Sequence, residues 1–224
     1  DLLDQFGVKS TFFVPAVNAL NHPEVLGDII RRGHEVGCHG YQHEAVTDLE
    51  EEEERKRLRR TLEILERITG ERPRGHRLAG DEPSPNTFRL LKEEGILYDS
   101  SLRDSDLPYL LPLANCRTDK PFLVEIPSYY EMDDFHLFAD YPGIEGYEAR
   151  IQSTSTAYDI WTNAFDGYYR YGLCYTTMFH PQIIGKPGYL LLMEKLLQYI
   201  KSHSGVWFAK AGEIANFWIA QGGM

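Results

Sequence analysis

The sequence predicts an α/β fold with parallel strands, built as one domain over residues 1–224. Short runs rich in β-branched and aromatic residues alternate along the chain with longer runs whose apolar residues recur at helical spacing. This alternation is typical of parallel α/β folds. No repeat, linker or low-complexity stretch divides the 224 residues, a length that suits one large domain. We therefore expect a single α/β domain.

In the first half of the chain, turn and capping residues mark where the elements begin and end. Glycine closes each predicted helix. Asp48, with Glu51 three residues later, resembles a capping box, and Ser84 followed by Pro85 is typical of a helix start. The predicted elements, in order, are the end of a helix at 1–6, a strand at 9–15, a helix at 22–32, a strand at 34–38, a helix from 48 to 70, a strand at 74–79, a helix at 84–94 and a strand at 96–98.

The second half continues the alternation after one irregular segment. Residues 103–120 contain proline and lack periodicity, so we expect a long loop near the functional site. Trp161 and Phe165 lie one helical turn apart and are expected in the core. The predicted elements are a strand at 122–127, a helix at 147–170, a strand at 174–179, a helix at 189–200, a strand at 206–208 and a helix at 211–219.

A run of five glutamates, Glu50–Glu54, precedes a cluster of arginines and a lysine. Negative charge early in a helix and positive charge later suit the helix dipole. We therefore expect both groups to form the solvated face of the helix.

The composition argues against several functional classes. The formal net charge is -11, and an acidic surface repels phosphate backbones, so nucleic acid is not an expected partner. No apolar run approaches the roughly 18–20 residues of a membrane helix, so a membrane is not expected either. Cys38, Cys116 and Cys174 are too sparse for a disulfide framework or a cysteine-rich zinc site. Free thiols in a reducing cytoplasm fit this pattern.

Two histidines follow the second predicted strand, and a third follows a later strand. His39 and His43 come directly after residues 34–38, and His180 comes after residues 174–179. In parallel α/β folds, functional groups collect at the carboxyl ends of strands. A spacing of four can bring two imidazoles onto one metal ion. The alternative is a pair of hydrogen-bonding histidines without a metal.

The stretch from Gly33 to Glu44, which reads GHEVGCHGYQHE, resembles the second motif of the polysaccharide deacetylase (NodB-like) family. Other stretches resemble further parts of that family, in the same order along the chain. They are 7–15, 72–77, 95–102, 107–109, 125–127, 132–135, 180–187, 205–209 and 213–215. The resemblance implies an irregular (β/α) barrel. It also implies that the first strand, with its aspartate-rich motif, lies upstream of Asp1, so that the domain is N-terminally incomplete.

The resemblance implies a site that spans most of the chain. In that family, the two histidines of the second motif bind a divalent metal, usually zinc, which gives His39 and His43 as ligands. His180 would be the general acid. The other implied residues are Arg77, which would hold the catalytic carboxylate, and Asp134 or its neighbour Asp133, which would orient the acid. Apart from the resemblance, Tyr41 and Tyr109 are candidates for binding the substrate, as are Tyr129 and Tyr130, with packing as the alternative role.

The implied activity is metal-dependent hydrolysis of a non-peptide C–N bond, with deacetylation of an N-acetylated sugar or polysaccharide as the first expectation. Two alternatives stay open: a metal-independent hydrolase of a small cyclic imide or ureide, and a non-catalytic member of the family. The third motif, Arg77 to Asp81, lacks the usual proline and aromatic residue, which leaves substrate choice open. Residues 107–109, 125–127 and 132–135 resemble the cytosolic branch of the family, which contains peptidoglycan-deacetylase-like, cyclic-imidase-like and allantoinase-like proteins. The resemblance to this branch implies a cytoplasmic protein that forms dimers or tetramers, with 129–141 as a candidate contact surface.

Overall fold

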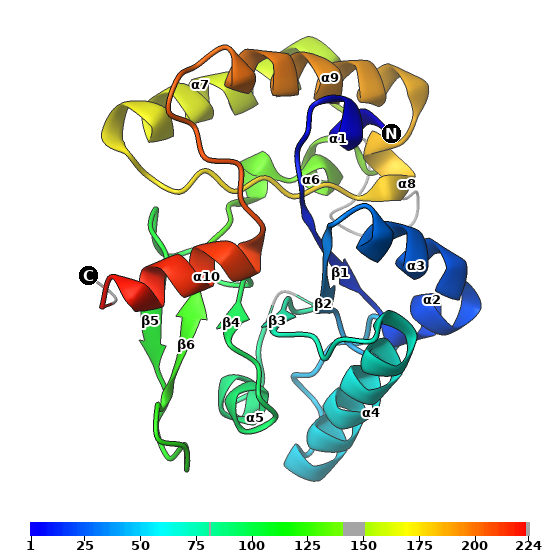
Figure 1. The fold of residues 1–224 in the computed structure, drawn as a ribbon, viewed down its shortest axis with the longest axis vertical. Helices are drawn as coiled ribbons and strands as arrows, with labels where there is room; N and C mark the ends of the chain where they lie inside the picture. Colours follow the sequence, from blue (N-terminus) through cyan, green and yellow to red (C-terminus); the bar gives the residue numbers. More distant parts are fainter. Residues whose placement is uncertain (81, 141–150, 223–224) are drawn as a thin grey trace.

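A computed structural model describes residues 1–80, 82–140 and 151–222. One six-stranded sheet runs through the molecule in the order β1-β2-β3-β4-β6-β5 (Figure 1). Every pair is parallel except β5 with β6, which is antiparallel. The strands are β1 (Thr11–Val14), β2 (Glu35–Cys38), β3 (Gly75–His76), β4 (Tyr98–Asp99), β5 (Tyr109–Pro112) and β6 (Phe122–Glu125). The predicted α/β class with parallel strands is confirmed.

Helices pack around the sheet and form a separate layer at one end of the molecule (Figure 1). α3 and α4 contact β2, α5 contacts β6, and α10 contacts β4 and β6. The helices are α1 (Leu2–Gln5), α2 (Ala16–Asn21), α3 (Pro23–Arg31), α4 (Glu51–Thr69), α5 (Thr87–Glu93), η1 (Tyr130–Met132), α6 (Asp134–Phe138), α7 (Thr154–Tyr171), α8 (Pro181–Ile184), α9 (Pro187–Lys201) and α10 (Ala211–Ala220).

Several predicted boundaries are wrong. Asp48 and Ser84 do not cap helices: the N-cap of α4 is Glu50 and that of α5 is Asn86. The predicted loop at 103–120 contains β5, whose partner β6 lies further along the chain, so no local pattern marked it. Residues 206–208 and most of 174–179 form no regular strand, although Met178 makes a parallel bridge with Asp133. Of the helix predicted at 147–170, the first residues lie outside the described ranges, as does Tyr141.

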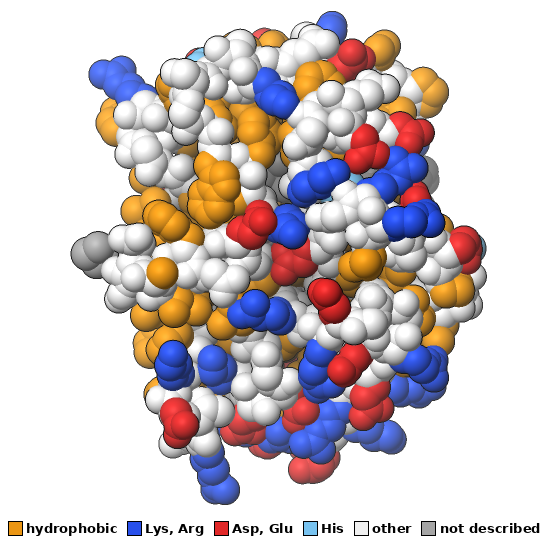
Figure 2. Space-filling model, in the orientation of Figure 1, with side chains coloured by type: hydrophobic (Ala, Val, Ile, Leu, Met, Phe, Trp, Pro, Cys, Tyr) orange, Lys and Arg blue, Asp and Glu red, His pale blue; other side chains and the backbone are white. Residues whose placement is uncertain are grey.

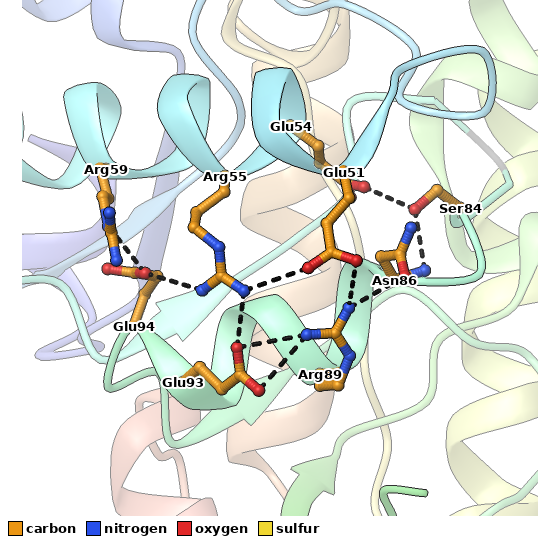
Figure 3. Close-up of polar contacts among 9 residues, drawn as sticks. All are labelled: Glu51, Glu54, Arg55, Arg59, Ser84, Asn86, Arg89, Glu93 and Glu94. Carbon is orange, nitrogen blue, oxygen red and sulfur yellow. Dashed lines mark hydrogen bonds and ion pairs between the residues drawn. The ribbon is translucent and has the colours of Figure 1, made fainter. Parts of the chain in front are cut away.

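The glutamate run is not wholly solvated as predicted. Glu54 is 5% exposed, and its carboxylate accepts hydrogen bonds from the hydroxyls of Ser84 and Thr87. Arg55 of the same helix pairs with Glu93 of α5 at 2.7 Å (Figure 3). Charged side chains of both signs gather over the end of the molecule that carries α4 and α5, at the bottom of the view (Figure 2). These contacts fasten α4 to α5.

The helical layer has its own core. Trp161 and Phe165 of α7 are buried, as predicted, and pack with residues of α6, α8 and α9. The Trp161 indole N–H donates to the carbonyl of Glu131 at 3.0 Å, and its ring meets Phe179 edge-on. This core therefore supports the chain on both sides of Asp134 and immediately before His180. Among the described residues, no helix has the length and apolar character required to cross a membrane.

Candidate active site

The carboxyl ends of four parallel strands are in register. Cys38 of β2 lies opposite His76 of β3, His76 opposite Asp99 of β4, and Asp99 opposite Glu125 of β6. The residue that follows each strand therefore emerges at the same edge of the sheet. The backbone N–H of Arg77 donates to the carbonyl of Cys38 at 3.0 Å, which sets Arg77 beside the start of the His39 loop.

His39 is oriented by the neighbouring strand. Its Nδ1 lies 2.8 Å from the carbonyl oxygen of Arg77. Because a carbonyl only accepts, Nδ1 carries the hydrogen and Nε2 keeps a free lone pair. Burial lowers the pKa of His39 to about 3, and the positive charges of His43 and Arg77 act in the same direction. The ring is therefore neutral near neutral pH, which is the state that binds a metal ion.

A strained loop presents His43. The rings of His39 and His43 meet edge-on, with centroids 4.9 Å apart. His43 has a φ of 65°, in the left-handed region that costs a non-glycine residue about 1 kcal/mol or more. The carboxylate of Glu44 accepts hydrogen bonds from the backbone N–H groups of Tyr41 and Gln42 and so holds the turn. Such strain is common at ligand-binding sites.

His180 and Asp134 form a tight pair. His180 Nδ1 lies 2.7 Å from Asp134 Oδ1, and the His180 backbone N–H donates to both carboxylate oxygens at 3.0 Å. Asp134 is fully buried. Burial of His180 opposes its charged form, but the hydrogen bond to Asp134 and the charges of Asp133 and Asp134 outweigh it and raise the pKa of His180.

The charge of Arg77 acts on both histidine groups. Its Nε donates to the carbonyl of Ser100 at 2.8 Å, and its guanidinium covers the ring of Phe13 at 4.7 Å. Its positive charge lowers the pKa of His39 and opposes the rise in the pKa of His180. Arg77 is therefore within electrostatic range of both groups, which belong to segments about 140 residues apart in the sequence.

The two predicted substrate-binding tyrosines contact side chains other than the histidines. The ring of Tyr41 packs against the guanidinium of Arg60 on α4 at 4.3 Å. The hydroxyl of Tyr109 donates to Asp104, at 2.9 Å from its nearer oxygen. Within the described ranges, neither ring makes a hydrogen bond or ring contact with His39 or His180. Their role stays a prediction.

The potential ligand atoms of the site can be compared with the donors that a divalent metal ion prefers. Among the described residues, one group of three potential ligands lies within 4.8 Å: Asp133, Asp134 and His180. Asp134 and the His180 Nδ1 already bind each other, which favours an acid and its partner over a metal site. His39 and His43 offer the neutral imidazoles that zinc prefers, although no third described residue joins them in such a group.

Sequence reasoning did not single out Ser100, Glu125 or the pairing of Asp99 with His76. Ser100 holds the Arg77 side chain, and its own hydroxyl donates to the carbonyl of Ile126 at 2.7 Å. Glu125 is fully buried. The sequence signals were their position at strand ends and their place in the family-like stretches 72–77, 95–102 and 125–127. These signals identify an edge of the sheet but not the contacts between strands.

Comparison with known proteins gives consistent results. A model of the family described as polysaccharide deacetylase matches residues 1–98. The peptidoglycan deacetylase of Helicobacter pylori is 29% identical over 96% of this chain and 80% of that protein. A peptidoglycan deacetylase-like protein of Gibberella zeae is 26% identical over 89% of this chain and 68% of that protein.

Solved structures match the entire chain. One from Mycobacterium smegmatis, described as a polysaccharide deacetylase, is 34% identical with a TM-score of 0.92 and is covered over 76% of its length. The structure of PuuE allantoinase is 31% identical with a TM-score of 0.87, and 71% of it is covered. One from Pseudomonas aeruginosa, described as a polysaccharide deacetylase, is 30% identical with a TM-score of 0.86 and 72% coverage. These likenesses agree with the predicted barrel type.

Proposed function

Because the chain belongs to the polysaccharide deacetylase family, we propose that it removes acetyl groups from an N-acetylated sugar or polysaccharide in a metal-dependent reaction. The family resemblance seen in the sequence is confirmed. The observation that carries the activity is the neutral His39, whose Nδ1 is occupied by the Arg77 carbonyl and whose ring meets His43.

We assign His39 and His43 as metal ligands, with zinc as the expected ion because imidazole is among its preferred donors. A divalent cation bound there would supply a Lewis acid that polarises the amide carbonyl and acidifies the attacking water. The hydrogen bond from His39 to a backbone carbonyl is typical of metal-binding histidines, since it fixes both the tautomer and the ring orientation.

We assign His180 as the general acid. An amine is a poor leaving group unless its nitrogen is protonated as the bond breaks. Asp134 holds Nδ1 of His180, so the proton to be donated is the one on Nε2. The raised pKa of His180 supports this role, because it keeps more of the ring protonated near neutral pH.

Hydrolysis of a small cyclic ureide is a second candidate, favoured by the 31% identity to PuuE allantoinase. It would use the same acid on a ring nitrogen. The two candidates differ in the size of the substrate and can be separated by assay.

The test uses the full-length protein and two readouts: acetate released from N-acetylglucosamine oligomers and peptidoglycan, and bound metal measured by elemental analysis. We expect His39→Ala and His43→Ala to lose metal and activity together, and His180→Ala to keep the metal while turnover falls by roughly 10²–10⁴-fold. His22→Ala, at an exposed histidine, is the matched control. Turnover of allantoin without acetate release would favour the second candidate. Full metal content in His39→Ala would show that the ligand assignment is wrong.

A further inference from the structure

Three ionisable side chains lie buried in a row across β3, β4 and β6. The register places His76 opposite Asp99 and Asp99 opposite Glu125. Asp99 and Glu125 are 0% exposed and His76 is 6% exposed. The Nδ1 of His76 lies 2.6 Å from Oδ2 of Asp99. Because an unpaired buried charge is costly, protons and charges must be balanced within this row.

One oxygen of each carboxyl group lacks a partner. Within the described residues, Asp99 Oδ1 and Glu125 Oε2 are buried and accept no hydrogen bond, although Asp99 and Glu125 are paired on neighbouring strands. The second oxygen of Glu125 already accepts the backbone N–H groups of Ser101 and Leu102, at 3.0 and 2.8 Å. Two ionised carboxylates cannot donate to each other, whereas one protonated carboxyl group would satisfy both oxygens.

We propose that Asp99 and Glu125 share one proton, carried on Oε2 of Glu125 and donated to Oδ1 of Asp99, and that the negative charge left on Asp99 positions Arg77. The second part rests on the proposed function, because it takes Arg77 as a site residue. The first part is independent of any activity.

The surroundings assign the charge to Asp99. Asp99 is the carboxylate in contact with His76. Arg77 is tied to the residue that follows Asp99, because its Nε donates to the carbonyl of Ser100 at 2.8 Å and its guanidinium donates to the Ser100 hydroxyl at 2.6 Å. Burial lowers the pKa of Arg77, and the charge of Asp99 is the strongest influence opposing that fall. Burial, followed by the charge of Asp99, raises the pKa of Glu125 to about 9. Ionisation of both carboxyl groups is therefore unfavourable near neutral pH.

Glu125 supports the turn after β4 through hydrogen bonds that a glutamine side chain could also accept. It holds the backbone of Ser101 and Leu102, while the preceding residue, Ser100, accepts the hydrogen bonds of the Arg77 guanidinium. Other ionisable groups face this pair from the neighbouring strands. They are Cys38 of β2, whose pKa burial raises to about 12, Tyr109 of β5, opposite Glu125, and Asp133, which acts on Arg77 from outside the sheet.

The first experiment compares the unfolding of wild type, Glu125→Gln and the exposed control Glu63→Gln by denaturant between pH 5 and pH 8.5. When the pKa of an acid is higher in the folded state than in the unfolded state, the protein loses stability as pH rises from the unfolded-state pKa toward the folded-state pKa. Relative to Glu125→Gln, the unfolding equilibrium constant of wild type should therefore rise by about tenfold per pH unit in this range. Glu63→Gln should follow wild type. Parallel curves for wild type and Glu125→Gln would overturn the shared proton.

A second measurement does not depend on a variant folding. In wild-type protein labelled with ¹³C at the glutamate carboxyl carbons, one resonance should keep the position of a protonated carboxyl group at pH 7. Absence of such a resonance would contradict the proposal. For the positioning role, the Arg77 Nε–H resonance should stay in place in Glu125→Gln and move in Asp99→Asn. An unmoved resonance in a folded Asp99→Asn variant would show that Asp99 does not position Arg77. All of these readouts need no substrate, so they fail or succeed separately from the proposed activity.

Discussion

At the scale of single residues, the chemistry depends on how the protein sets the charge of two histidines in opposite directions. His39 loses solvent and gains only a carbonyl partner, so its pKa falls to about 3. His180 is also desolvated, but it gains a buried carboxylate, so its pKa rises. One imidazole is thus prepared to bind a cation and the other to donate a proton.

The first prediction concerns Asp134→Asn. Asparagine can still accept the Nδ1–H hydrogen bond but carries no charge, so the pKa of His180 should fall by roughly one unit or more. An acid works only while it is protonated, so the alkaline limb of the profile of kcat/KM against pH should move to lower pH. The exposed variant Asp159→Asn is the control. An alkaline limb that stays at its wild-type pH in Asp134→Asn would rule out His180 as the titrating acid.

The second prediction concerns the left-handed backbone at His43. Asparagine tolerates this region better than alanine does, because its short polar side chain can bond locally. We expect His43→Asn to be more stable than His43→Ala by about 0.5–1 kcal/mol in the metal-free protein, as measured by denaturant unfolding. Both variants lose the imidazole, so each controls for the other. Equal stability would mean that the loop relaxes out of the strained conformation.

At the scale of elements, long helices were predictable and the short strands of the sheet were not. Apolar periodicity located α4 because that helix buries one stripe of its surface. β3 and β4 are two residues each, too short to show any period, and β5 depends on a partner that follows it in the chain. Strand-end position found His39, because parallel strands bring their carboxyl ends together. Arg77 came from the family resemblance, and the strand expected before His180 is reduced to the bridge at Met178.

The third prediction tests the connection between α4 and α5. Glu54→Ala leaves the buried hydroxyls of Ser84 and Thr87 without their acceptor, so the free energy of unfolding should fall by about 1–3 kcal/mol. Glu52→Ala, an exposed change in the same helix, should stay within about 0.5 kcal/mol of wild type. Thermal or denaturant unfolding measures both. A loss for Glu54→Ala no larger than that of Glu52→Ala would mean that water replaces the carboxylate.

At the scale of the whole molecule, the site is assembled from two regions with separate cores. His39 and Arg77 follow strands of the sheet, whereas Asp134 and His180 are carried by the helical layer around Trp161. Sequence patterns predicted the site residues of the sheet and of the helical layer but not the distance between the two groups, since the packing between the two regions leaves no periodic signal. Oligomer formation stays a prediction. The exposed rings of Trp207 and Phe217, which contact each other, add apolar surface outside the predicted segment 129–141.

The fourth prediction concerns the core of the helical layer. Trp161→Phe keeps most of the packing but removes the hydrogen bond to Glu131, so stability should fall by about 1–3 kcal/mol. Because Phe179, beside His180, packs on this ring, turnover should also fall, while bound metal should not change. Trp207→Phe, at a residue that is 56% exposed, is the matched control for both readouts. Wild-type turnover in a destabilised Trp161→Phe protein would show that the core around Trp161 does not support the function of His180.

The hydrogen bond between His39 and residue 77 uses the backbone carbonyl of Arg77, not its side chain. Every amino acid has that carbonyl, so a mutation at codon 77 can change the guanidinium without changing the tautomer of His39. During divergence, selection could therefore alter the side chain at position 77 while metal affinity persisted. The tautomer of His39 and the side chain at position 77 are thus free to evolve separately, and relatives that differ at this position could still retain the bound ion.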